Sequence, residues 1–185
     1  MIIKKTYFEK LYNDEIISMM RKKYNIINPH QVPKIEKIVV NMRFSKVKDD
    51  EKAIEAGMKE LALVSGFKPA YAKAKKSIST FKTKIGDILG ARTTLRKKNM
   101  YYFLEKFINV ALPRTRDFKG FKLSSLDKNY NLICGVSDIL IFPELGYDDI
   151  HKSRGLDVNI VTSGLTSKEM ALEFFRAFRI PLHEN

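Results

Sequence analysis

The sequence predicts an α+β fold with a mostly antiparallel sheet, helices packed on one face of it, and a long basic loop. Helical spacing and short β-branched segments alternate irregularly, without the strand–helix rhythm or GxGxxG motif of a doubly wound fold. The chain has 185 residues, 44% of them hydrophobic and 30% charged, which is ordinary globular composition. No internal repeat or low-complexity tract divides it, so we expect a single domain over residues 1–185.

The N-terminal part predicts a helix and then a strand. Apolar residues recur at steps of three and four from Lys4 to Tyr24, which predicts an amphipathic helix that ends before Pro29. Lys34 to Met42 is short and β-branched, so it predicts a strand with one buried face. The start of the chain has neither a secretory apolar core nor an acid-poor transit composition, so we expect a soluble protein that begins near Met1.

A second helix is predicted over residues 51–65, because Asp49 or Asp50 can cap its start and Gly66 suits a left-handed residue at its end. The next elements are a strand over residues 68–74, an exposed flexible basic loop over residues 75–90, and a strand over residues 92–96.

Beyond that loop, helical spacing predicts a helix over residues 99–112 that Pro113 stops. Two short strands are expected at residues 132–134 and 139–142. Residues 156–162 show the clearest alternation of the chain and predict a further strand. Thr166 and Glu169 have the spacing of a capping box, which predicts the start of a last helix.

Catalytic and metal-binding patterns are weak. Cys134 is the single cysteine, and the three histidines are scattered, so we expect no disulfide, metal site or cofactor. The acidic residues from Glu144 to Asp157 read as a solvated loop. One alternative stays open, an RNA-modifying or RNA-processing enzyme with its active site near Asp148 and Asp149. Another is a basic protein held at an anionic membrane surface.

Charge is strongly segregated along the chain. The net charge is +13, and 15 of the 34 Lys and Arg residues lie between Lys68 and Lys122. A cationic segment interleaved with aromatic residues indicates a polyphosphate-binding surface, so nucleic acid is the first partner to consider. Lysines meet phosphates as point charges, whereas arginines offer planar forks. Three aromatic residues among these charges could pack on RNA or belong to the core: Phe81, Phe118 and Phe121.

Six sequence blocks carry a family resemblance, in the order and spacing of that family. They are Asn41 within KIVVNM, KAKKSISTFK from Lys73, TTLRKKNMYYFLEKF from Thr93, ALPRTRDFKGF from Ala111, IFPEL from Ile141 and RGLDVNIVT from Arg154. With these blocks the chain resembles the bacterial-type ribosomal large-subunit protein five family, whose members bind 5S rRNA. The match runs from about Tyr7 to Pro181 and implies a structural, non-enzymatic ribosomal protein.

The resemblance implies that the protein contacts 5S rRNA, large-subunit rRNA and neighbouring ribosomal proteins in the central protuberance. A basic loop would reach toward the P-site tRNA, and no membrane is involved. The host ribosome would be in the bacterial cytoplasm or in an organelle matrix, such as that of a mitochondrion. The predicted RNA-binding residues are Asn41, Lys68, Arg92, Thr94, Arg96, Lys97, Arg114, Arg116 and Lys119. The predicted tRNA-facing residues are Lys73, Lys75, Lys76, Ser77, Ser79, Phe81, Lys82 and Lys84.

Overall fold

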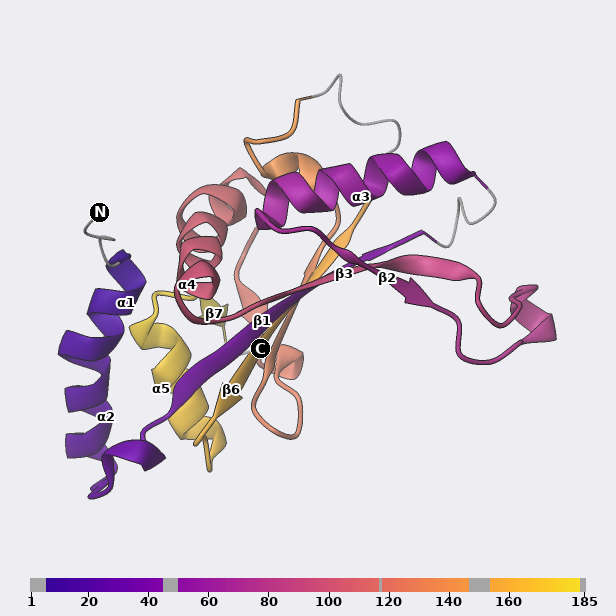
Figure 1. Ribbon diagram of the computed structural model, residues 1–185. Coiled ribbons are helices and arrows are strands. Elements are labelled where there is room, and N and C mark those ends of the chain that lie inside the picture. The colour runs from indigo at the N-terminus through magenta and orange to yellow at the C-terminus, as the bar shows by residue number, and fades with distance from the viewer. Residues whose placement is uncertain (1–5, 45–49, 117, 147–153, 184–185) are drawn as a thin grey trace. The chain divides into compact units, whose positions relative to one another are not determined.

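The protein is an α+β structure built on a five-stranded, mostly antiparallel sheet with the strand order β2-β3-β1-β6-β5 (Figure 1). A computed structural model describes residues 6–44, 50–116, 118–146 and 154–183. The sheet strands are β1 (Lys34–Arg43), β2 (Ala70–Lys73), β3 (Ile88–Leu95), β5 (Leu132–Val136) and β6 (Leu156–Ser163). The helices are α1 (Tyr7–Leu11), α2 (Ile17–Lys23), α3 (Glu51–Ser65), α4 (Lys97–Lys106) and α5 (Lys168–Ala177).

The chain forms two compact units. Unit 1 contains Met1–Ile38, Leu95–Cys134 and Asn159–Asn185, and unit 2 contains Val39–Thr94 and Gly135–Val158. The expectation of a single domain over residues 1–185 stays a prediction.

Unit 1 is organised around aromatic side chains from both ends of the chain. Phe8 of α1 and Phe178, which follows α5, are both fully buried, with ring centroids 6.1 Å apart. Tyr12 stacks on Phe178 at 6.1 Å. A π-helical turn, Tyr12–Ile16, joins α1 to α2, so the helix predicted between Lys4 and Tyr24 is confirmed over its described residues.

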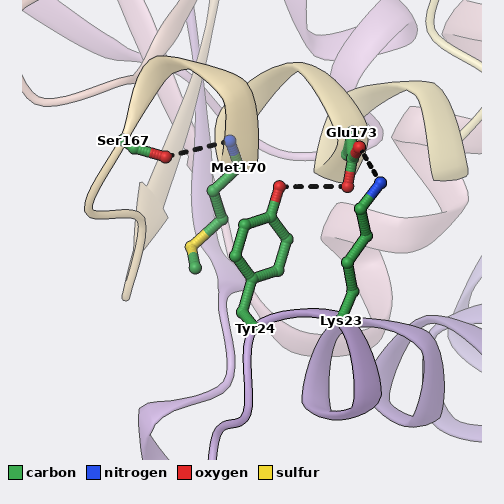
Figure 2. A network of polar contacts seen from close by, with 5 residues as sticks. All are labelled: Lys23, Tyr24, Ser167, Met170 and Glu173. Atoms are coloured by element: carbon green, nitrogen blue, oxygen red, sulfur yellow. Dashed lines mark hydrogen bonds and ion pairs between the residues drawn. The ribbon is translucent and has the colours of Figure 1, made fainter.

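Polar contacts also join α2 to α5 (Figure 2). The Tyr24 hydroxyl donates to Glu173 Oε2 at 3.0 Å, and Lys23 Nζ pairs with the other carboxylate oxygen. Ser167, and not Thr166, caps α5, because its Oγ accepts from the Met170 amide at 3.2 Å. The capping box predicted at Thr166 is therefore wrong by one residue.

Unit 2 packs α3 on strands of the sheet. Both predicted ends of this helix are confirmed, since Asp50 Oδ1 accepts from the Ala53 amide at 3.1 Å and Gly66 has φ +73°. A buried arginine, Arg154, donates to Glu60 Oε2 at 2.9 Å and to the Ala53 carbonyl at 2.8 Å. This arginine therefore holds α3 to the segment that enters β6.

Several predicted boundaries differ from the structure. Residues 139–142 do not form a strand: Ile139–Ile141 is a 3-10 turn, because Asp138 Oδ1 accepts from the Leu140 amide at 3.0 Å. The helix predicted at residues 99–112 starts earlier, as α4, and continues as a π-helical turn over Phe107–Ala111. A short parallel pair, β4 (Phe121–Lys122) with β7 (Leu182–His183), was not predicted.

Candidate nucleic-acid interface

The outer face of the unit 2 strands carries three of the predicted RNA-binding residues. Along β3, Ala91, Thr93 and Leu95 are buried, whereas Arg92 and Thr94 are exposed. Along β1, Val40 and Met42 are buried, and Asn41 between them is partly exposed. Because β1 and β3 are neighbours in the sheet, their outward-facing residues share one surface.

Small residues flank Arg92 on this surface. Ala70 of β2 lies directly opposite Arg92, and Ala72 lies opposite Gly90. A Cβ atom at Gly90 would come within 2.3 Å of the Met42 carbonyl oxygen, so a glycine lets β3 approach β1 closely here. Arg92 is therefore an exposed side chain that faces a small residue on the neighbouring strand β2.

Sequence reasoning missed Arg43 as a residue of this surface. It lies two positions after Asn41 on the same strand, and its side chain is 79% exposed. Arg43 Nη2 lies 3.1 Å from Asp157 Oδ2 on the neighbouring strand β6. Side chains two positions apart on a strand share a face, so the spacing of Arg43 from Asn41 was a signal present in the sequence.

Lys68 is exposed in the turn between α3 and β2, next to Phe67, a residue that is 44% exposed. The Ser65 hydroxyl donates to the Leu61 carbonyl at 2.7 Å and accepts from the Phe67 amide at 3.3 Å, which fixes this turn to the end of α3. An exposed aromatic ring beside a lysine can stack on a base and neutralise the adjacent phosphate.

In unit 1, three consecutive cations begin α4. Arg96 is the N-cap residue without a side-chain cap, the first turn contains no acidic residue, and Lys97 and Lys98 follow. The four amide groups at a helix start lack intrahelical partners and form the positive end of the helix dipole. Cations at this position oppose helix stability, whereas a bound phosphate would satisfy both the amides and the cations.

A second cationic segment of unit 1 follows α4. Arg114, Arg116 and Lys119 are all exposed along the chain from the 3-10 turn Leu112–Arg114 to β4. Phe121 is only 7% exposed and meets Phe118 edge to face at 5.1 Å. Phe121 therefore belongs to the core, and of the two readings left open for it the RNA-packing one is wrong.

The basic loop between β2 and β3 extends beyond the ends of both strands (Figure 1). Its last residues, 88–90, belong to β3. The predicted tRNA-facing residues are all exposed, and Phe81 is 72% exposed. These exposed residues are Lys73, Lys75, Lys76, Ser77, Ser79, Phe81, Lys82 and Lys84.

Other chemistry finds little support. The described residues contain no cluster of His, Cys, Asp and Glu able to hold a metal ion. Cys134 is buried, and burial raises the pKa of its thiol, which keeps it from acting as a nucleophile. Asp148 and Asp149, the acidic residues of the enzyme alternative, lie outside the described residues. Within the described part, no helix is both long and apolar enough to cross a bilayer.

Comparison with known proteins identifies the same family twice along the chain. Residues 28–84 match the family described as "Ribosomal protein L5", and residues 88–182 match the model of the C-terminus of that same ribosomal family. A protein of Malacoplasma penetrans is 44% identical over 169 residues, covering 91% of this chain and 90% of its own length. One from Caldanaerobacter subterraneus is 46% identical over 158 residues, covering 85% and 88%. One from Clostridium botulinum is 44% identical over 173 residues, covering 94% and 96%. Each is named "Large ribosomal subunit protein uL5".

Proposed function

This chain belongs to the ribosomal protein L5 family and is a structural, non-enzymatic constituent of the large ribosomal subunit; from that premise we propose that it binds 5S rRNA and large-subunit rRNA in the central protuberance. The observation that carries the proposal is the exposed cationic and polar set on a chain that matches the family over residues 28–84 and 88–182. The enzyme alternative fails, because the family is structural.

Unit 2 offers the surface that fits 5S rRNA. Asn41 and Thr94 provide hydrogen-bonding groups that can set register, and Arg92 provides a fork for phosphate. The small side chain of Ala70 opposite Arg92 would let an RNA backbone approach the strands there. Duplex RNA is recognised mainly through phosphates, 2′-hydroxyls and shape, and a β surface with a few projecting side chains suits that mode.

Unit 1 offers phosphate sites at the start of α4 and along residues 114–119, which we assign to rRNA. The loop between β2 and β3 is assigned to the P-site tRNA, since it carries lysines and one exposed aromatic ring away from the strands. Neighbouring ribosomal proteins complete the set of partners. The relatives named above are bacterial, which supports a host ribosome in the bacterial cytoplasm.

Salt dependence of 5S rRNA binding tests the proposal. With about six phosphate contacts, the slope of log affinity against log salt should be near −5, because each contact contributes about −0.9 on a duplex. Replacing Arg92, Arg96 and Arg114 with glutamine should reduce the steepness of that slope by about 3, with an unchanged circular dichroism spectrum. In the matched control, glutamine replaces Lys52, Lys59 and Lys128, three exposed lysines outside the proposed contacts. This variant should keep the wild-type slope of log affinity against log salt. A wild-type slope shallower than about −1 contradicts the proposal.

A further inference from the structure

The tip of the basic loop, residues 77–87, is built from two nested turns. Ile78 and Thr83 exchange backbone hydrogen bonds at 2.9 and 3.1 Å, and the Lys82 amide donates to the Ser79 carbonyl at 2.9 Å. The Gly86 amide donates to the Ala74 carbonyl at 3.0 Å, and the Ala74 amide donates to the Asp87 carbonyl at 2.8 Å. The chain therefore returns on itself twice before β3.

Two side chains fasten these turns to each other. Ser77 Oγ accepts from the Ile85 amide at 2.9 Å, across the base of the inner turn. Asp87 Oδ2 accepts from the Lys84 amide at 2.8 Å, and the Asp87 amide donates back to the Lys84 carbonyl at 3.2 Å. Gly86, with φ +93°, supplies the left-handed residue that this second turn needs.

Asp87 is also the only acidic residue between Lys68 and Leu104. A carboxylate among lysines that face phosphate weakens phosphate binding by repulsion. Its hydrogen bond to a backbone amide gives it a different role. Short polar side chains that bond to nearby amides are a standard means of fixing a turn.

We propose that Ser77 and Asp87 are positioning residues that hold the loop tip in one conformation, so that its lysines and Phe81 meet the tRNA already arranged. The inference rests on the proposed tRNA contact. Any motion of the loop is then motion of the tip as a whole, with little ordering left to occur on binding. If Asp87 acts by positioning the loop, removing its carboxylate should weaken tRNA binding. If it acts only through its charge, removing the carboxylate should strengthen tRNA binding.

The test compares D87A with D87N in the full-length protein. Both remove the same charge, but only asparagine keeps an oxygen that can accept from the Lys84 amide. The pair S77A and S77T repeats the comparison at the other side chain, since threonine keeps the hydroxyl. The readouts are amide hydrogen exchange at Lys84 and Ile85 by NMR, and binding of a tRNA transcript by fluorescence anisotropy.

We expect D87A and S77A to accelerate exchange at these amides about three- to tenfold, the effect of one lost hydrogen bond. D87A should bind the transcript about two- to fivefold more weakly than D87N, which should bind at least as tightly as wild type. Equal exchange and equal affinity in D87A and D87N would overturn the inference.

A further variant tests whether the loop contacts tRNA at all. The double variant K76Q/K84Q removes two exposed charges of the loop and keeps the hydrogen bonds that Ser77 and Asp87 accept. If it binds the transcript as wild type does, the loop does not meet tRNA, and the inference falls with that contact. If it binds more weakly, the comparison of D87A with D87N decides the role of Asp87.

Discussion

Lys97 is held in a conformation that works against folding, so replacing it should stabilise the protein while weakening RNA binding. Its backbone has φ +55°, in the left-handed region, at the first residue of α4. It also places a cation at the positive end of the helix dipole, between Arg96 and Lys98. Asparagine tolerates the left-handed region better than lysine does and carries no charge.

The magnitude of the stability gain follows from these two terms. Removing one cation from a helix start is worth about 0.3–1 kcal/mol. Easing the left-handed strain, which costs about 1–2 kcal/mol, recovers part of that amount. The free energy of unfolding of K97N should therefore rise by about 1 kcal/mol, which raises Tm by about 2–4 °C in a chain of this length.

RNA binding should change in the opposite direction. If Lys97 neutralises one phosphate, K97N should reduce the steepness of the salt slope by about 0.9. The variant K97Q separates the two causes, because glutamine removes the charge but keeps the backbone strain. Its salt slope should become less steep by the same amount as that of K97N, while its free energy of unfolding should rise less. Urea unfolding and titrations of 5S rRNA at several salt concentrations measure both quantities. A K97N protein that is less stable than wild type, or has an unchanged slope, refutes this reasoning.

Further predictions concern the cores and their polar contacts. R154M should lower the free energy of unfolding, measured with urea, by about 3–5 kcal/mol, because it removes the guanidinium that pairs with buried Glu60. The double variant R154M/E60L should recover most of this loss. A double variant as unstable as R154M would contradict the prediction. The hydrogen bond from Lys23 holds the pKa of Glu173 below its ordinary value of 4.5, so its contribution is present above that pH and is lost as pH falls through the lowered pKa. E173Q should therefore lower the urea midpoint at pH 7, and this loss should shrink as the pH is brought down below 4.5; a loss that is the same at every pH would speak against an ionic origin. Burial raises the pKa of the Cys134 thiol, so a thiol reagent at pH 8 should modify it only after unfolding, and rapid modification of the folded protein would show that the site opens.

Local chemistry explains which parts of the fold were predictable. The ends of α3 could be predicted because Asp50 and Gly66 cap the helix through local geometry, a side-chain hydrogen bond at its start and a left-handed residue at its end. Arg92 was selected by its place in the cationic segment and Thr94 by the family resemblance, and β3 exposes both. The turn at Ile139–Ile141 was read as a strand because a short apolar run has the same pattern in either state, and Asp138 decides between them only through its hydrogen bond.

The candidate interface was predicted in composition more than in arrangement. Charge segregation selected the cationic residues, which the structure exposes. The left-handed backbone of Lys97 and the burial of Phe121 depend on the path of the chain, so residue type alone does not reveal them. The β4–β7 pair consists of two residues on each strand, too few for any periodic signal.

The contact of Phe8 with Phe178 has a consequence for the synthesis of this polypeptide. The aromatic partner of the first helix, Phe178, lies 170 positions further along the chain in the same unit, so it is translated long after Phe8. Until that segment has been synthesised, Phe8 and Tyr12 lack their contacts with Phe178. A nascent chain of this kind offers a holdase chaperone an apolar target from an early stage, and the emergence of α5 from the ribosome is the moment at which that target can be covered.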